Sequence, residues 1–490
     1  MLVLAKRLFV VCAVVAMSGC ATLQLNNLFQ DYASQFQPVR TALVQGDIES
    51  AQSNIKKAYA GDTNYQLSLV EQGRIAFLQG DIKQSKWWFE QSYQALEQER
   101  ARAKLTVGRS VEQVNTLVTN DNAIAYQLPA YEQSMMHGYQ ALNYAFAHDL
   151  EGALVEVRRA NYIQEAALAQ HERELLNAEQ AQAIEGIDLN YLDNTMSALT
   201  SKAGQLKNGF QNAYTFYLSG ILYEAAGQLN DAYIDYKRAF EIFPENRYLQ
   251  RDVLRLGSVL GMNNDLDVYR EQLGKDNVGQ VLKSIEKGRG ANAAQTGQLV
   301  IVYEQALIAA KHEQAVQLPI WTSGGDPRFY SVSVPSYDHN QRSNKARLPE
   351  SLTVTVGERE LTAATIVNLQ ALVAKQLAER LPAIVSRQVL RLVAKEQVRK
   401  KLSKEGGDVG NILAGLYNLA SERADTRSWL TLPGDVQIIR ADIPLGDHRL
   451  AINQHSQRRQ PITVNISADK MTLVVISEVG QLWQVKQVEL

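Results

Sequence analysis

The stretch Ala213–Asn246 reads AYTFYLSGILYEAAGQLNDAYIDYKRAFEIFPEN and decides how the first half of this chain folds. Its small, aromatic and turn-forming residues fall at fixed offsets: Gly220, Tyr223, Gly227, Ala232, Tyr236, Ala239 and Pro244. We expect Gly220 and Ala232 to face each other where two helices cross, because larger side chains would hold the helices apart. Gly227 is placed to end the first helix, and Pro244 to end the second. The stretch therefore predicts a helix–turn–helix hairpin.

This spacing resembles the tetratricopeptide (TPR) pattern, a repeat of ~34 residues folded as two antiparallel helices. One hairpin cannot bury its apolar face alone, so further copies are expected along the chain. The run Gln-Gly-Asp-Ile occurs around both Gly46 and Gly80, and 80 − 46 = 34. Gly73 and Ala153 fall at small-residue positions of the same frame. The frame predicts repeats at Tyr32–Tyr65, Gln66–Glu99 and Ser134–Ala167, with a partial copy after Asn246.

The N-terminus has the features of a secretion signal. A basic pair precedes an apolar run, which ends in Met17-Ser18-Gly19-Cys20. These four residues resemble the lipobox of bacterial lipoproteins, which implies cleavage after residue 19 and lipidation of Cys20. By the same resemblance, Ala21 rather than Asp after the cysteine implies an anchor in the outer membrane, on its periplasmic face. The alternative is a signal peptide without lipidation.

Composition narrows the possible functions. The length of 490 residues predicts two or three domains. A formal net charge of −2 gives no electrostatic argument for binding nucleic acid. Cleavage would remove Cys12 and lipidation would use Cys20, and the sequence has no other cysteine. The mature chain is therefore expected to lack disulfides and thiolate metal sites.

The chain divides into four predicted parts. Residues 1–19 are the signal peptide, residues 20–31 a lipidated tether, and residues 32–292 the TPR-like helical repeats. From residue 297 to residue 490, short β-branched runs separated by turn residues predict a β-sandwich, with a helical insertion at about residues 362–422. The predicted fold class is multidomain α + β, a TPR-like α-solenoid followed by a β-sandwich-like domain with a helical insertion.

The whole architecture resembles a family of TPR-bearing lipoproteins from Gram-negative bacteria that has no assigned function. Three runs carry the resemblance: Leu299–Tyr303, Gln317-Leu318-Pro319, and Ala424–Trp429 followed by Leu432-Pro433. The resemblance implies a fold and a location in the cell envelope, and it implies no activity.

Sequence motifs for catalysis are missing. The seven histidines are scattered, and none forms the His-Glu-x-x-His helix of a zinc protease. The chain has no Gly-x-Ser-x-Gly nucleophile elbow and no phosphate-binding Walker loop. We therefore predict a protein that is not an enzyme and that has no cofactor and no metal.

A candidate partner groove follows from the repeat frame. In a TPR solenoid the first helix of each repeat lines the concave face. Arg40 and Arg74 occupy the same repeat position, since 74 − 40 = 34. Apolar and aromatic residues take neighbouring positions on this face: Phe36, Val70, Phe77, Tyr214 and Tyr217. Such a groove suits an extended or carboxylate-bearing peptide, and the alternative is that both arginines are solvated surface residues.

These patterns favour a lipid-anchored scaffold that recruits a periplasmic or envelope protein for cell-envelope assembly or maintenance. A cell-wall or glycan binding module built on the C-terminal β-domain is the first alternative, and an unrecognised enzyme is the second. Residues 387–404 form a dense basic run, which predicts either contact with an anionic surface or a solvated helix face. The sequence predicts neither the identity of the partner nor an oligomeric state.

Overall fold

The computed structural model describes residues 31–106, 121–180, 192–289, 295–321, 327–337, 350–392, 423–454 and 457–490. The predicted signal peptide and Cys20 lie outside the described residues, as do most of the tether and residues 393–404 of the basic run. Residues 393–422 of the predicted helical insertion also lie outside them.

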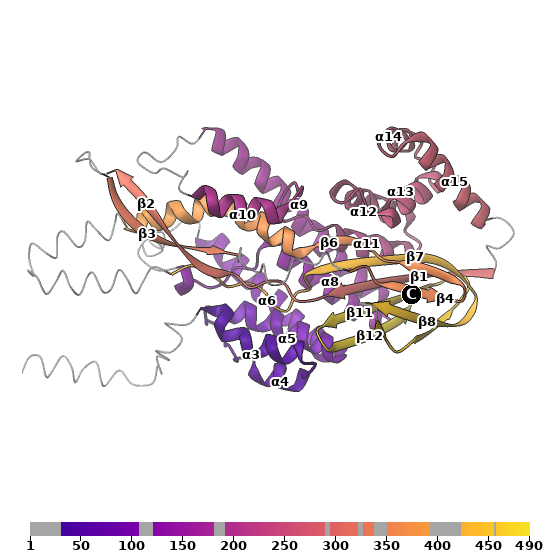
Figure 1. Ribbon diagram of the computed structural model, residues 1–490, viewed down its shortest axis with the longest axis horizontal. Coiled ribbons are helices and arrows are strands. Elements are labelled where there is room, and N and C mark those ends of the chain that lie inside the picture. The colour runs from indigo at the N-terminus through magenta and orange to yellow at the C-terminus, as the bar shows by residue number, and fades with distance from the viewer. Residues whose placement is uncertain are drawn as a thin grey trace, which may run out of the picture.

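Helical hairpins make up most of the first half of the chain (Figure 1). The paired helices are α3 (Tyr32–Val44) and α4 (Ile48–Asn54), α5 (Tyr65–Gln79) and α6 (Ile82–Thr106), α8 (Ala130–Phe146) and α9 (Leu150–Gln180), α11 (Ala213–Ala225) and α12 (Leu229–Ile242), and α13 (Arg247–Val259) and α14 (Asn263–Leu273). The elements between and after them are a 3-10 turn η1 (Asp121–Ala123), α10 (Asp193–Ala203) and α15 (Lys275–Arg289). The chain therefore carries TPR-like helical repeats.

Each hairpin turns at a residue with a positive φ angle. These residues are Gly46, Gly80, His148, Gly227 and Gly261. Glycine takes this conformation without steric cost because it has no Cβ atom. His148 follows Gly80 by two repeat lengths, since 148 − 80 = 68, and it has φ 58°. The third hairpin thus keeps the turn geometry although its sequence has lost the glycine.

Two hairpins pack a glycine of the first helix against an aromatic ring of the second. A Cβ atom added at Gly220 would lie 2.5 Å from the ring of Tyr236, and one added at Gly73 would lie 2.7 Å from the ring of Phe89. In both hairpins the ring follows the glycine by 16 residues (236 − 220 and 89 − 73). This corrects the expected facing of Gly220 and Ala232, because the space at Gly220 is taken by Tyr236.

The C-terminal half forms two larger sheets and a separate ribbon (Figure 1). The first sheet has the order β12 (Leu482–Glu489), β11 (Met471–Val479), β1 (Thr296–Gln305), β7 (Asp435–Pro444) and β6 (Ala364–Asn368). The second has the order β10 (Ile462–Ile466), β8 (Gly446–Gln454), β4 (Thr353–Val356) and β5 (Arg359–Thr362), with β9 (Gln457–Arg458) on β8. The ribbon pairs β2 (His312–Trp321) with β3 (Pro327–Ser336). Of the described pairs, β1 with β11 is parallel and the others are antiparallel.

Several details differ from the sequence-based expectation. The predicted helical insertion does not begin at residue 362, because β5 ends there and residues 364–368 form β6 against β7. The helix covers residues 369–392 and continues through Pro382. Residues 428–432 join no sheet. The described chain is a mixed α and β structure, and the β-sandwich stays a prediction.

The helical repeats and the sheets share one hydrophobic core. A single cluster of buried side chains extends from Leu67 on α5 to Val488 on β12. Leu299–Tyr303 on β1 are all fully buried, so both faces of the first sheet are covered. A smaller cluster joins the α3–α4 hairpin to Leu430 and Leu482. The two halves therefore stabilise each other, and they do not pack as two independent domains.

Candidate functional site

The predicted partner groove is not open in the structure. Its apolar and aromatic residues are all buried: Phe36, Val70, Phe77, Tyr214 and Tyr217. Arg74 is 1 % exposed, and Arg40 is only partly exposed. The expectation of an accessible groove is therefore wrong, because C-terminal residues of the same chain lie in it and bind both arginines.

An extended segment occupies the part of the groove formed by α3, α5 and α8. We call residues 424–432 the groove segment. Glu71 on α5 accepts hydrogen bonds from the backbone N–H of Leu430 at 2.6 Å and of Thr431 at 3.1 Å. Arg40 on α3 donates to the carbonyl oxygen of Leu430 at 2.7 Å. Side chains of the repeats thus bind the main chain of an extended segment, much as a groove binds a peptide.

The groove segment is anchored by a tryptophan. Trp429 is 0 % exposed, and its ring centroid lies 5.8 Å from that of Phe89 and 5.9 Å from that of Tyr139. Glu132 on α8 accepts the backbone N–H of Trp429 at 2.9 Å. The indole Nε1 donates to the hydroxyl of Thr431 at 2.9 Å, so the buried ring leaves no N–H unpaired.

The start of the groove segment is held by an arginine that donates to the helical part. The guanidinium of Arg427 donates to the carbonyl oxygens of Asp121 at 2.8 Å, Ile124 at 2.9 Å and Thr63 at 3.3 Å. Asp425 pairs with the same guanidinium at 2.8 Å. The segment is therefore fixed at both ends and is a built part of the fold.

The two carboxylates that bind the groove segment are fully buried. Burial raises the pKa of Glu71 to about 8, while its hydrogen bonds from Thr431 and Leu430 act in the opposite direction. Burial also raises the pKa of Glu132, against the hydrogen bonds from Trp429 and Tyr131. Amide groups stabilise these carboxylates by hydrogen bonding, but they carry no charge to replace lost hydration.

A second contact joins α5 to the first sheet. Arg74 pairs with Glu304 on β1 at 2.7 Å, and both side chains are 1 % exposed. Glu304 also accepts the hydroxyl of Tyr139 at 2.7 Å and that of Ser477 at 2.6 Å. Arg74 donates in addition to the carbonyl of Thr431. The arginine predicted to contact a partner thus holds the β-sheet and the groove segment.

A third contact joins α11 and α13 to β7 through a network centred on Arg440. Its guanidinium lies 2.8 Å from Glu224 and 3.2 Å from Asp252, and it donates to the hydroxyl of Tyr236 at 2.8 Å. Arg255 pairs with Glu224 at 2.7 Å. Burial alone would raise the pKa of Glu224, but the two guanidinium groups lower it to about 2. We call these residues the Arg440 network.

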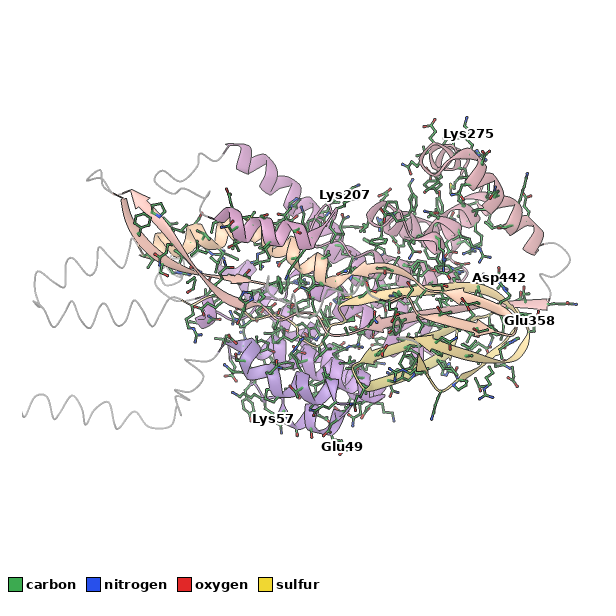
Figure 2. All side chains as sticks on the ribbon, viewed as in Figure 1. Glu49, Lys57, Lys207, Lys275, Glu358 and Asp442 are labelled. Atoms are coloured by element: carbon green, nitrogen blue, oxygen red, sulfur yellow. The ribbon has the colours of Figure 1, made fainter. Side chains whose placement is uncertain are left out.

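The outer face of the repeats carries two cavities where α9 and α12 meet. One has a volume of about 350 Å³, and its lining includes the apolar side chains of Leu168 and Phe216. The other has a volume of about 270 Å³. Both are lined by Glu165 and Arg238, which form an ion pair at 2.7 Å. The exposed Lys207, labelled in Figure 2, lines the first cavity.

Exposed apolar side chains border the second cavity. Tyr162 on α9 is 67 % exposed and Ile234 on α12 is 47 % exposed, and both line the cavity. Val155, about two helical turns before Tyr162 on α9, is 42 % exposed. We call the two cavities with Tyr162 and Ile234 the outer seam. It combines apolar surface with a concave shape, as binding surfaces often do.

The described residues give no other sign of chemistry. Among them, no group of three or more His, Cys, Asp or Glu side chains is placed to hold a metal ion. None of their helices is long and apolar enough to cross a membrane. Arg391 of the basic run is not on a solvated face, since it is 2 % exposed and pairs with Asp121 at 2.7 Å.

The groove segment was the functional feature that sequence reasoning missed. Its residues 426–432 are all buried, so they show no alternation of exposed and buried side chains. Arg427, Ser428, Trp429 and Thr431 mix polar and apolar side chains without a helical or strand period, so the run gives no sequence signal of the groove in which it lies.

No family model matches the chain, and no curated protein matches it. Among solved structures, one that is similar is the complex of the TPR2AB domain of yeast Sti1 with pHSP90. The sequence identity is 13 %, the match covers 52 % of this chain and 95 % of that chain, and the TM-score is 0.18. This likeness is too distant to support an argument, so the helical repeats rest on the hairpins and turns described above.

Proposed function

We propose that this protein is a periplasmic scaffold, anchored to the outer membrane by a lipid on Cys20, that recruits protein partners for cell-envelope assembly or maintenance. The observation that supports a scaffold is the self-filled groove. Because the repeats bind their own groove segment and share a core with the sheets, they form a stiff frame. A partner would then use the outer surface of that frame.

The outer seam is the surface we assign to the partner. It lies on the second helices of two repeats, away from the groove segment. Tyr162 and Ile234 offer apolar contact area, and the cavity lined in part by Leu168 and Phe216 has room for a side chain of the partner. A few apolar and aromatic side chains commonly supply most of the binding energy at such surfaces.

The test of this proposal is a pair of matched double variants. Tyr162→Asp with Ile234→Asp places charge on the outer seam. Tyr59→Asp with Val268→Asp is the control, since these residues are 71 % and 48 % exposed, against 67 % and 47 % in the seam. Cross-linking in intact cells followed by mass spectrometry should show a partner that the seam variant loses and the control keeps. If the seam variant keeps every cross-linked partner, the seam is not the binding surface.

The anchor is tested separately. Cys20→Ser removes the thiol that the lipid would occupy, so the protein should appear as a soluble or uncleaved form after cell fractionation. The native chain should remain with the outer membrane after a high-salt wash. A Cys20→Ser protein that stays with the outer membrane under the same wash would contradict lipid anchoring.

A further inference from the structure

The second cavity of the outer seam, with a volume of about 270 Å³, is lined by more acidic than basic side chains. The carboxylates belong to Glu165, Asp231 and Asp235, and the guanidinium groups belong to Arg158 and Arg238. The formal charge of the lining is therefore 2 − 3 = −1. The first cavity has no such excess, because two basic and two acidic side chains line it. The two cavities thus differ in the charge of the group that each would accept.

Both basic side chains of the second cavity already have partners. Arg238 pairs with Glu165 at 2.7 Å and with Asp235 at 3.2 Å. Arg158 donates from Nε to the hydroxyl of Tyr223 at 3.2 Å. These contacts provide a cation for two of the three carboxylates and leave the third without one.

Asp231 is the third carboxylate. It lies in the first turn of α12, it is exposed, and it makes no hydrogen bond or ion pair with the residues that the structure describes. Tyr162 lines the same cavity, and its side chain is 67 % exposed. A cation placed between them would gain from the charge of the carboxylate and from the face of the aromatic ring.

A buried acceptor in the same lining also has no donor. Asn161 lines the cavity and is 7 % exposed. Its Nδ2 donates to Asp235 at 2.8 Å and to the hydroxyl of Ser219 at 3.2 Å, which fixes the orientation of the amide. Its Oδ1 is buried and accepts no hydrogen bond from the described residues. The lining therefore contains an unmatched acceptor in addition to its excess of negative charge.

We propose that the second cavity takes an arginine side chain of the protein partner, an inference that rests on the outer seam being the partner surface. A guanidinium group supplies positive charge opposite Asp231, donates several hydrogen bonds in one plane, and stacks on aromatic rings such as that of Tyr162. Lysine supplies the charge as one compact ammonium group and matches several acceptors less well. Ile234, exposed beside the cavity, would contact an apolar neighbour of that arginine.

A phage library of random dodecapeptides tests this proposal without knowledge of the natural partner. The library is selected on the full chain, and phages that also bind the Tyr162→Asp/Ile234→Asp variant are removed. The peptides that remain depend on the outer seam, and they should be enriched in arginine over the starting library. In the tightest of them, replacing the arginine by glutamate should raise the Kd about tenfold or more, and replacing it by lysine should raise it less.

Matched variants of the chain locate the arginine in the second cavity. Asp231→Lys should raise the Kd of the selected peptide about tenfold or more, because repulsion replaces attraction. Glu271→Lys is the control, since it reverses an exposed glutamate on α14 that lines neither cavity, and it should keep the native Kd. The peptide with glutamate in place of arginine should bind Asp231→Lys more tightly than it binds the native chain. Fluorescence polarisation measures each Kd, and circular dichroism checks that each variant is folded.

Three results would overturn the proposal. They are seam-dependent peptides with no enrichment in arginine, a Kd that Asp231→Lys leaves unchanged, and the recovery of no seam-dependent peptide at all. None of them decides whether the outer seam binds the natural partner, because the cross-linking of the Tyr162→Asp/Ile234→Asp variant in intact cells answers that question. A failure of the arginine site is therefore distinguishable from a failure of the proposed function.

Discussion

Carboxylates are buried at two contacts between the helical repeats and the C-terminal half, and different partners stabilise them at each contact. At the first contact, Glu71 on α5 and Glu132 on α8 accept backbone N–H groups of the groove segment, and burial raises the pKa of both. In the Arg440 network, Glu224 faces two guanidinium groups, and its pKa falls to about 2. Neutral amides provide hydrogen bonds without charge, whereas guanidinium groups provide both.

Because the pKa values of Glu71 and Glu224 shift in opposite directions, the two contacts should change the stability of the fold with pH in opposite directions. The pKa of Glu71 is about 8 in the folded chain and 4.5 as its ordinary value. Between these values the folded state holds a proton that the unfolded state has released, so stability falls as the pH rises. For Glu224 the unfolded state holds the extra proton between pH 4.5 and about 2. Its stabilisation is present above pH 4.5 and is lost as the pH falls toward 2.

The largest effect that separates the two contacts is expected from Trp429→Ala. The substitution removes a fully buried ring from the groove segment and leaves a cavity beside Phe89 and Tyr139. The free energy of unfolding should fall by about 3–5 kcal/mol. Denaturant unfolding followed by circular dichroism would measure it.

The control for this variant is Trp87→Ala, because Trp87 is 50 % exposed. Its cost should stay below about 1 kcal/mol. Equal costs for the two variants would mean that the groove segment is not a core element of the repeats, and that the groove is open in solution.

A smaller effect is expected from two matched carboxylate variants. Glu224→Gln leaves the guanidinium groups of Arg440 and Arg255 short of a partner, which should cost about 3 kcal/mol at neutral pH. Glu71→Gln removes no charge pair, so it should cost about 1 kcal/mol. Melting temperatures measured from pH 3 to pH 9 would compare both variants with the native chain.

The pH profiles distinguish the two contacts more sharply than the costs. Glu71→Gln should remove part of the decline in melting temperature toward alkaline pH. Glu224→Gln should remove part of the decline toward acid pH. A reversed assignment, with Glu71→Gln acting on the acid side, would show that the groove carboxylate is ionised in the folded chain over the whole range.

The hairpins were predictable from sequence because their turns require a local feature. Gly46 and Gly80 lie one repeat length apart and Gly227 ends the first helix of the Ala213–Asn246 hairpin, and each has a positive φ angle that glycine adopts freely. His148 shows where this signal ends, since it takes the same conformation with no glycine to mark it. The packing partner of Gly220 was missed because a sequence pattern gives the position of a small residue and not the ring that fills the space.

The two arginines of the groove were predicted from the sequence, and the segment that they bind was not. The repeat frame placed Arg40 and Arg74 on one concave face, and both donate to the groove segment there. Their occupant could not be predicted, because Leu430 and Thr431 lie more than 350 residues away in sequence. Contacts at that separation leave no periodic signal in either partner.

The sequence by itself determined the repeat unit, the turns marked by glycine and the shared repeat position of Arg40 and Arg74, since helix periodicity and glycine conformation act over a few residues. Only the tertiary structure decided that the groove segment of the same chain lies on this face. That outcome depends on long-range partners: Glu304 for Arg74, Glu71 for the groove segment, and Glu224 for Arg440. Burying each charge is favourable only after its distant partner has arrived, so no local stretch of sequence could settle it.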